Sequence, residues 1–100
     1  MHFDAATNAP GLPHPSPPAL PHLSRHLQLH YEAAQARWVL IAPDSMVQLN
    51  DSAAEILRRC DGRRTVANIV NELETLFDTR GIAPQVQELL AESWRRGWFD

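Results

Sequence analysis

The hydrophobic and polar positions first alternate along the chain and then follow a helical period. Over residues 26–31, leucine and tyrosine alternate with polar residues, which predicts a half-buried strand. The nearly continuous apolar run of residues 37–42 predicts a central strand that is covered on much of both faces. Residues 43–45 are turn-forming, and residues 46–49 predict a third, shorter strand. Three strands on short connections predict an antiparallel meander.

From Asn50 the apolar residues recur at helical spacing. The first predicted helix places four residues on one face: Ala53, Ile56, Leu57 and Cys60. Asn50 or Ser52 can cap its start, and Ser52 with Glu55 fits a capping box. Gly62 is expected to end this helix in the left-handed conformation.

Two further helices follow the same period. Thr65 is a candidate cap for the second helix, and Gly81 is expected to stop it. Pro84 suits the first position of a third helix, and Gly97 suits its end. Residues 98–99 are expected to fold back on the core. The second and third helices place these residues on their apolar faces: Val66, Ile69, Val70, Leu73, Leu76, Phe77, Val86, Leu89, Leu90 and Trp94.

This order of elements predicts an α+β domain with a small three-stranded antiparallel sheet followed by three helices, similar to a winged helix-turn-helix. The helices are expected to pack on one face of the sheet. A short edge strand beside a helix forms a groove that an extended peptide can enter as an added strand. We expect such a groove between the third strand and the third helix. Its expected peptide-binding residues are Met46, Val47, Gln48, Leu49, Asn50, Val86, Leu89, Leu90 and Ser93.

The first part of the chain has a different composition. Six of the eight prolines lie in residues 1–21, which show almost no apolar periodicity and predict a solvated, disordered tail. The folded domain is therefore expected to span residues 22–100. The tail lacks the basic start and apolar run of a signal peptide, and no stretch approaches the roughly 20 apolar residues of a membrane span. We expect a soluble, cytoplasmic protein.

Charge is the next distinguishing feature. The formal net charge is −3, and all nine basic residues are arginines. Four of them surround the predicted turn after the first helix: Arg58, Arg59, Arg63 and Arg64. Their guanidinium groups can interact with the carbonyl groups at the helix end, bind carboxylates of a docked partner, or bind phosphates. Against phosphates, the third helix carries Gln85, Gln87, Glu88 and Glu92, which is too little positive charge for a DNA-recognition helix.

The remaining candidate chemistry favours a binding protein over an enzyme. His22, His26 and His30 lack carboxylate or cysteine neighbours at ligand spacing, so we expect no metal site. The single Cys60 excludes an internal disulfide, and its place in an apolar stripe favours a packing role over nucleophilic catalysis. The chain contains no Gly-rich phosphate loop, recognisable acid–base pair or nucleophile elbow. We expect neither catalysis nor a bound cofactor.

The central part of the chain resembles the PqqD family. The pattern Leu-Asn-x-x-Ala-x-x-Ile-Leu is followed by Cys-Asp-Gly and by a Thr-Val helix start. The matching residues are Leu49, Asn50, Ala53, Ile56, Leu57, Cys60, Asp61, Gly62, Thr65, Val66 and Ile69. The resemblance covers roughly residues 22–100. The chain departs from the family at Asp44-Ser45, where Glu-Gly is frequent, and at Gln85, where an acidic residue is frequent.

The resemblance implies a role in the biosynthesis of pyrroloquinoline quinone (PQQ). Proteins of this kind are peptide chaperones that bind a ribosomal precursor peptide (PqqA-like) and present it to a radical S-adenosylmethionine (SAM) enzyme (PqqE-like). The clusters and the radical chemistry belong to that enzyme, so this chain is expected to carry no cofactor. A free sheet edge is compatible with a monomer or a homodimer. The alternative is a winged-helix DNA-binding protein.

Overall fold

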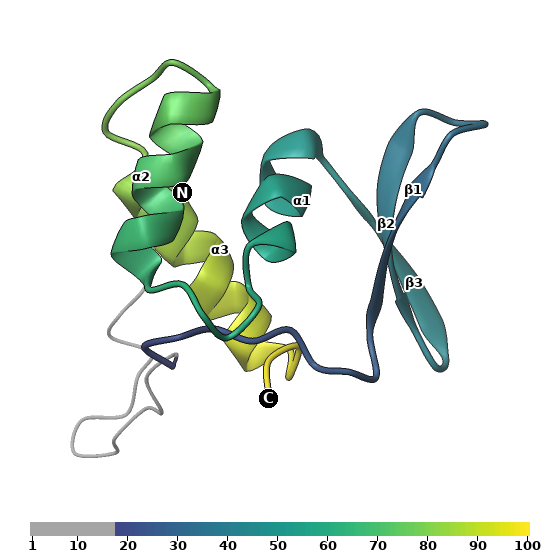
Figure 1. The fold of residues 1–100 in the computed structure, drawn as a ribbon. Helices are drawn as coiled ribbons and strands as arrows, with labels where there is room; N and C mark the ends of the chain where they lie inside the picture. Colours follow the sequence, from purple (N-terminus) through teal and green to yellow (C-terminus); the bar gives the residue numbers. More distant parts are fainter. Residues whose placement is uncertain (1–17) are drawn as a thin grey trace, which may run out of the picture.

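A computed structural model describes residues 18–100 and shows a three-stranded antiparallel sheet followed by three helices (Figure 1). This confirms the predicted α+β class and the order of elements. The strands are β1 (Gln28–Glu32), β2 (Arg37–Ala42) and β3 (Ser45–Leu49). The helices are α1 (Asp51–Arg58), α2 (Val66–Leu76) and α3 (Ala83–Arg95). Most of the predicted tail lies outside the described residues.

The sheet has the order β1-β2-β3, so β2 is central and both other strands are edges. The register aligns Leu29, Leu40 and Val47 across the three strands. All three belong to the hydrophobic core or pack against it, and Leu40 is fully buried. One face of the sheet is therefore the core face, as the period-two pattern predicts, but Tyr31, which the pattern places on the same face as Leu29, is 45% exposed.

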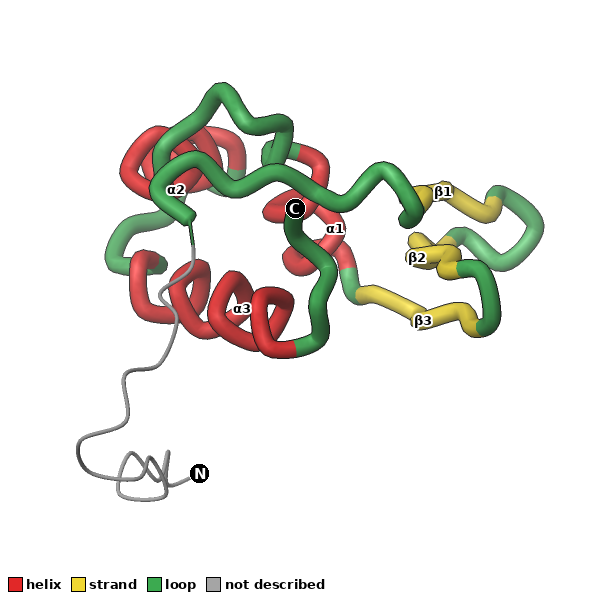
Figure 2. Tube along the Cα trace, turned by 90° about the horizontal axis from the view of Figure 1, so that it is seen from below, coloured by secondary structure: helices red, strands yellow, loops and turns green. Residues whose placement is uncertain are grey.

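α1 joins the sheet to the other helices. It contacts all three strands, and it also contacts α2, which in turn packs against α3. Figures 1 and 2 both place α1 between the sheet and the α2–α3 pair. The expected packing of helices on the sheet is thus made mainly by α1, and the space between α1 and α3 lies beside the sheet rather than beneath it.

Local signals set the helix starts. Asn50 caps α1, because its Oδ1 accepts a hydrogen bond of 2.7 Å from the backbone N–H of Ala53. The alternative cap at Ser52 is not used. Thr65 caps α2 and forms a capping box with Asn68. Pro84 lies in the first turn of α3, which has no side-chain cap from its own N-cap residue.

The helix ends depend more on tertiary contacts. α1 ends at Arg58, earlier than the glycine predicts, although Gly62 does adopt φ +80°. α2 ends at Leu76, and Asp78 with φ 49° turns the chain before Gly81 is reached. Gly97 follows α3 with φ +75°, as predicted.

The segment before β1 connects distant parts of the chain. The backbone N–H of Gly62 donates to the carbonyl of Pro21 at 2.9 Å, and the N–H of Asp100 donates to the carbonyl of His22 at 2.9 Å. Pro21 is fully buried, so this residue of the predicted tail packs with the folded part. Phe99 is also buried in the core, which confirms the predicted return of residues 98–99.

Candidate functional site

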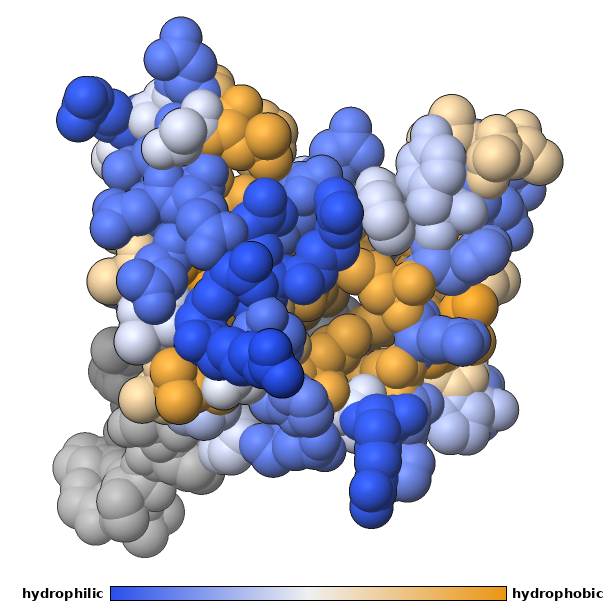
Figure 3. Space-filling view, in the orientation of Figure 1, coloured by the Kyte–Doolittle hydropathy of each residue, from blue (hydrophilic) through white to orange (hydrophobic). Residues whose placement is uncertain are grey.

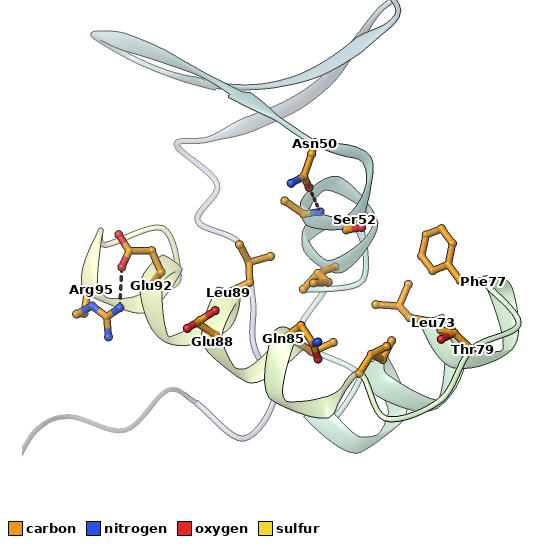
Figure 4. A pocket seen from close by; sticks show the side chains of 14 residues that line it. Asn50, Ser52, Leu73, Phe77, Thr79, Gln85, Glu88, Leu89, Glu92 and Arg95 are labelled. Atoms are coloured by element: carbon orange, nitrogen blue, oxygen red, sulfur yellow. Dashed lines mark hydrogen bonds and ion pairs between the residues drawn. The ribbon is translucent and has the colours of Figure 1, made fainter. Parts of the chain in front are cut away.

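A hollow lies between α1 and α3 and is closed at one end by the end of α2 and the loop that follows it. It is a cavity of about 830 Å³, here called the α1–α3 pocket (Figure 4). Figure 4 shows side chains of α1 on one side of the gap and side chains of α3 on the other. The lining residues are Asn50, Ser52, Ala53, Ile56, Leu73, Phe77, Thr79, Ile82, Gln85, Val86, Glu88, Leu89, Glu92 and Arg95.

The wall that closes the pocket comes from the loop between α2 and α3. The carboxylate of Glu74 accepts hydrogen bonds from the backbone N–H groups of Gly81 at 2.8 Å and Ile82 at 3.3 Å. These are donors at the start of α3, which has no cap of its own. Glu74 thus fixes the loop that brings Phe77 and Thr79 to the pocket (Figure 4).

The charges on α3 differ along the pocket. Glu92 forms ion pairs with Arg95 at 2.6 Å and with Arg96 at 2.8 Å. Hydrogen bonds from Arg96 and Arg95 hold the pKa of Glu92 below its ordinary value. Glu88 is exposed and forms no ion pair with any of residues 18–100. Within the described residues, the pocket rim therefore carries one carboxylate without an ion-pair partner.

The open edge of β3 leads into this pocket. In an antiparallel pair, alternate residues of an edge strand direct their N–H and C=O groups away from the partner strand. Ala42 and Ser45 are partners across the two-residue turn, and we infer from this register that Met46 and Gln48 carry the outward groups. β3 then passes directly into Asn50, which lies at the sheet side of the pocket (Figure 4).

The pocket and the edge belong to the best-matched part of the chain. The family model for coenzyme PQQ synthesis protein D (PqqD) matches residues 37–98, which contain β2, β3 and all three helices. This chain belongs to the PqqD family. The match confirms the family resemblance of the sequence.

Relatives of similar length support the assignment to the PqqD family. A protein named PqqA binding protein from Methylococcus capsulatus is 42% identical over 83 residues, covering 83% of this chain and 89% of that protein. The PqqA binding protein of Azotobacter vinelandii is 42% identical over 82 residues, covering 81% of this chain and 89% of that protein.

A solved structure shares the PqqD fold. The solution NMR structure of the PqqD truncation of Methylobacterium extorquens PqqCD matches with a TM-score of 0.66 and 26% identity. The match covers 85% of this chain and 93% of that one. That protein is described as a functional, stand-alone recognition element for ribosomally synthesised and post-translationally modified peptides (RiPPs).

The structure divides the sequence-predicted groove residues of this PqqD-family chain into three groups. Asn50, Val86 and Leu89 line the α1–α3 pocket. Leu90 is only 1% exposed and Ser93 is fully buried, so both side chains belong to the core, as does most of Val86, which is also 1% exposed. The residues on β3 are Met46, Val47, Gln48 and Leu49; the first and third are exposed, and the second and fourth pack against the core.

Several pocket residues escaped the sequence analysis. Phe77 is 46% exposed although it lies at the end of the apolar stripe of α2. The sequence did contain a signal for this exposure, because Phe77 lies at the last turn of the helix, where a helix often leaves the core. Glu74 gave no sequence signal, because its two partners lie seven and eight residues ahead in a loop.

Most of the arginine cluster is occupied within the domain. Arg59 pairs with Glu55 at 2.8 Å and with Glu72 at 3.2 Å. Arg64 pairs with Glu72 at 2.7 Å. These contacts join α1, the following turn and α2, and Figure 3 shows a continuous hydrophilic surface over this region.

The outer arginines of the cluster differ from each other. Arg58 pairs with Glu55 at 3.1 Å and lies over the Trp38 ring at 5.4 Å. Arg63 forms no ion pair with the described part of the chain, and its backbone N–H donates to Asp61. Among the four arginines, Arg63 is therefore the one whose guanidinium forms no ion pair within residues 18–100, and it is available to a second molecule.

Cys60 and the histidines are placed as packing and surface residues. Burial raises the pKa of the Cys60 thiol to about 12, and the neighbouring Asp61 adds to the effect. The thiol remains protonated and donates to the carbonyl of Ile56 at 3.3 Å. His26 and His30 are exposed, and residues 18–100 contain no cluster suited to hold a metal ion. No helix in this part of the chain is long and apolar enough to cross a membrane.

Proposed function

We propose that the chain binds a PqqA-like ribosomal precursor peptide during PQQ biosynthesis and presents it to a radical SAM enzyme in the cytoplasm. One observation carries the proposal: the open edge of β3 leads directly into the α1–α3 pocket. The relatives named PqqA binding protein and the RiPP recognition element of the same fold support it.

Strand addition explains how such a peptide is held. The backbone of the peptide pairs with the outward groups of Met46 and Gln48, which gives affinity that depends little on the peptide side chains. The exposed side chains of these two residues lie on the sheet face opposite the core. Beyond Leu49 the peptide reaches the pocket, where Leu89 offers an apolar contact.

Presentation follows from the same geometry. A peptide added at β3 becomes the new edge strand, so its own outer edge is free for a second protein. This chain then acts without catalysis. The burial of Cys60, the candidate nucleophile, supports this, because its thiol remains protonated. Arg63, on the turn between α1 and α2, is the member of the arginine cluster best placed to receive a carboxylate of the enzyme.

The DNA-binding alternative has less support. In a winged-helix protein, the third helix would enter the major groove with positive side chains. Here Arg95 and Arg96 both pair with Glu92, and Glu88 adds to the same helix a carboxylate without an ion-pair partner among residues 18–100. Such a surface repels phosphates.

A proline in β3 tests strand addition. The change Gln48→Pro removes the outward N–H of this residue and keeps the ladder donors on the β2 side. We expect the Kd for PqqA-type precursor peptide to rise by at least about tenfold, since two or more backbone hydrogen bonds are perturbed at roughly 1 kcal/mol each. Isothermal titration calorimetry measures the effect.

The matched control is Gln48→Ala, which removes the side-chain bond to Arg37 and leaves the backbone intact. Its Kd should remain within about twofold of wild type, because an exposed side-chain bond contributes little. Circular dichroism first establishes that both variants are folded. A folded proline variant that binds like wild type would show that the peptide does not pair with β3. Sedimentation with and without peptide tells whether the complex is monomeric or dimeric.

A further inference from the structure

The α1–α3 pocket extends well beyond the part that a strand on β3 can reach. Asn50 lies at its sheet side, whereas Phe77 and Thr79 lie at the far end, beside the α2–α3 loop (Figure 4). A peptide backbone on β3 meets only the Asn50 end. To fill the rest of the pocket, a bound peptide must place side chains of a further segment there.

The pocket has the size and the wall of a binding site. Its volume of about 830 Å³ falls in the range of roughly 300–1,000 Å³ that is usual for ligand pockets. Phe77 and Leu89 line it with apolar surface, and Phe77 is 46% exposed. Exposed aromatic surface inside a concave site favours an apolar partner group.

The rim selects the charge of that partner. Glu92 pairs with Arg95 at 2.6 Å and with Arg96 at 2.8 Å, so its carboxylate is already engaged at this end of the rim. Glu88 precedes Leu89 on α3 and has no ion-pair partner among residues 18–100. A carboxylate beside apolar surface attracts a cation that is bound at the same site.

We propose that the pocket is a second subsite, which receives a segment of the precursor peptide with a large apolar side chain beside a lysine or arginine. The apolar side chain lies against Phe77 at the far end of the pocket, and the cation pairs with Glu88 on α3 (Figure 4). This subsite rests on the proposed peptide-binding function and adds the chemistry of the segment that is bound beyond the β3 edge.

Glu74 is a positioning residue for this subsite. Its carboxylate holds the N–H groups of Gly81 and Ile82 and so fixes the loop that forms the far wall. If the wall loosens, Phe77 is no longer held against the bound side chain. The effect should therefore depend on whether the peptide fills the pocket.

An alanine scan of the peptide's basic residues tests the charge preference. Each lysine and arginine of the PqqA-type peptide is changed to alanine in turn, and calorimetry measures the Kd with wild type and with Glu88→Gln. We expect one position where alanine weakens wild-type binding about three- to fivefold and leaves the Glu88→Gln variant unaffected. The matched control is Glu32→Gln, on the opposite edge strand β1, which should show the wild-type pattern.

A second arm tests the wall. Glu74→Ala should weaken binding of the intact peptide about fivefold, and Glu74→Gln, which retains one acceptor oxygen, should recover most of it. Against a peptide whose pocket-filling side chain is cut to alanine, Glu74→Ala should bind like wild type. An equal loss for both peptides would show a general effect on folding and would contradict the positioning role.

The outcomes separate this inference from the proposed function. If no basic position couples to Glu88 while Gln48→Pro still raises the Kd by at least about tenfold, strand addition stands and the subsite is wrong. Two other occupants would also overturn it. Tighter peptide binding after deletion of residues 1–17 would assign the pocket to the chain's own N-terminal segment. A concentration-dependent dimer that is lost on Glu88→Arg would assign it to a second copy.

Discussion

The two ends of α1 face different surroundings. At its first turn, Asn50 and Ser52 border the α1–α3 pocket, where the carboxylate of Glu88 on α3 has no ion-pair partner among residues 18–100. At its last turn, Arg58 and Arg59 are held by Glu55 and, from α2, by Glu72. In the sequence the arginine-rich end is the more conspicuous. The structure shows that the arginines at this end form ion pairs that join α1 to α2. The α1–α3 pocket, by contrast, is lined by residues without a distinctive sequence pattern, which come from all three helices.

Two neighbouring leucines on α3 give the largest expected contrast. Leu90 is buried in the core, and Leu90→Ala should lower the free energy of unfolding by about 3 kcal/mol through the cavity it leaves. Leu89 is half-buried at the pocket, and Leu89→Ala should cost about 1 kcal/mol or less but raise the Kd for peptide severalfold. Urea unfolding and calorimetry measure the two quantities.

This contrast breaks if the two variants behave alike. Equal losses of stability would mean that Leu89 is as much a core residue as Leu90. An unchanged peptide Kd for Leu89→Ala would remove the pocket from the binding site. The first result corrects the packing of α3, and the second corrects the proposed function.

The glycine of the arginine-rich turn gives the next effect. Gly62 has φ +80°, and a Cβ built there lies 3.1 Å from the ring of His22. Gly62→Ala should therefore destabilise by about 2 kcal/mol, with the peptide Kd unchanged. Gly97→Ala is the control, because φ is +75° there but no atom of residues 18–100 lies within 4 Å of the added Cβ. Its loss should be about 1 kcal/mol; an equal loss at both sites would show that the His22 contact is irrelevant.

Cys60 gives a smaller effect. Cys60→Ala should destabilise by about 1 kcal/mol, since a small buried side chain is lost, and peptide binding should be unaffected. With a pKa near 12, the native thiol should also react far more slowly with iodoacetamide at pH 9 than the thiol of the urea-unfolded chain. Rapid labelling of the native protein, or loss of function in a folded Cys60→Ala variant, would contradict the packing role.

The smallest effect concerns acid stability. Hydrogen bonds from Arg64 and, to a lesser degree, Arg59 hold the pKa of Glu72 below its ordinary value of 4.5. Because the pKa of Glu72 is lowered in the folded protein, its ionised carboxylate stabilises the fold at pH values above the ordinary pKa. This contribution is lost as the pH falls through the lowered pKa. Glu72→Gln should therefore show a smaller loss of stability on acidification than wild type, with unchanged peptide affinity at neutral pH. Parallel pH profiles for the two proteins would show that the network adds nothing.

Local physics explains what the sequence predicted well. The range of β2, the caps at Asn50 and Thr65, and the left-handed turns at Gly62 and Gly97 all depend on residues close in the chain. Periodicity also found most of the apolar faces of the helices, although Leu76 and Phe77, which it places on the apolar face of the second helix, are 53% and 46% exposed. These features need no knowledge of distant partners, so propensity and spacing were sufficient to predict them.

The remaining features depend on contacts between distant residues. Pro21 is buried because it meets the turn at Gly62, about forty residues ahead. Leu89 and Leu90 share one apolar stripe, and only the packing of α3 decides which one faces the pocket. The arginine cluster looked available because Glu72, its partner on α2, is remote in sequence. A groove prediction from one chain therefore located the region but mixed core and surface residues.

Amide chemical-shift mapping of the isotopically labelled protein with PqqA-type peptide tests the central claim most directly. The account predicts the largest shifts at Met46 and Gln48 on β3 and at Glu88 and Leu89 on α3, with little change at Arg63. Shifts centred on the turn between α1 and α2, with the β3 amides unmoved, would contradict peptide binding at this edge.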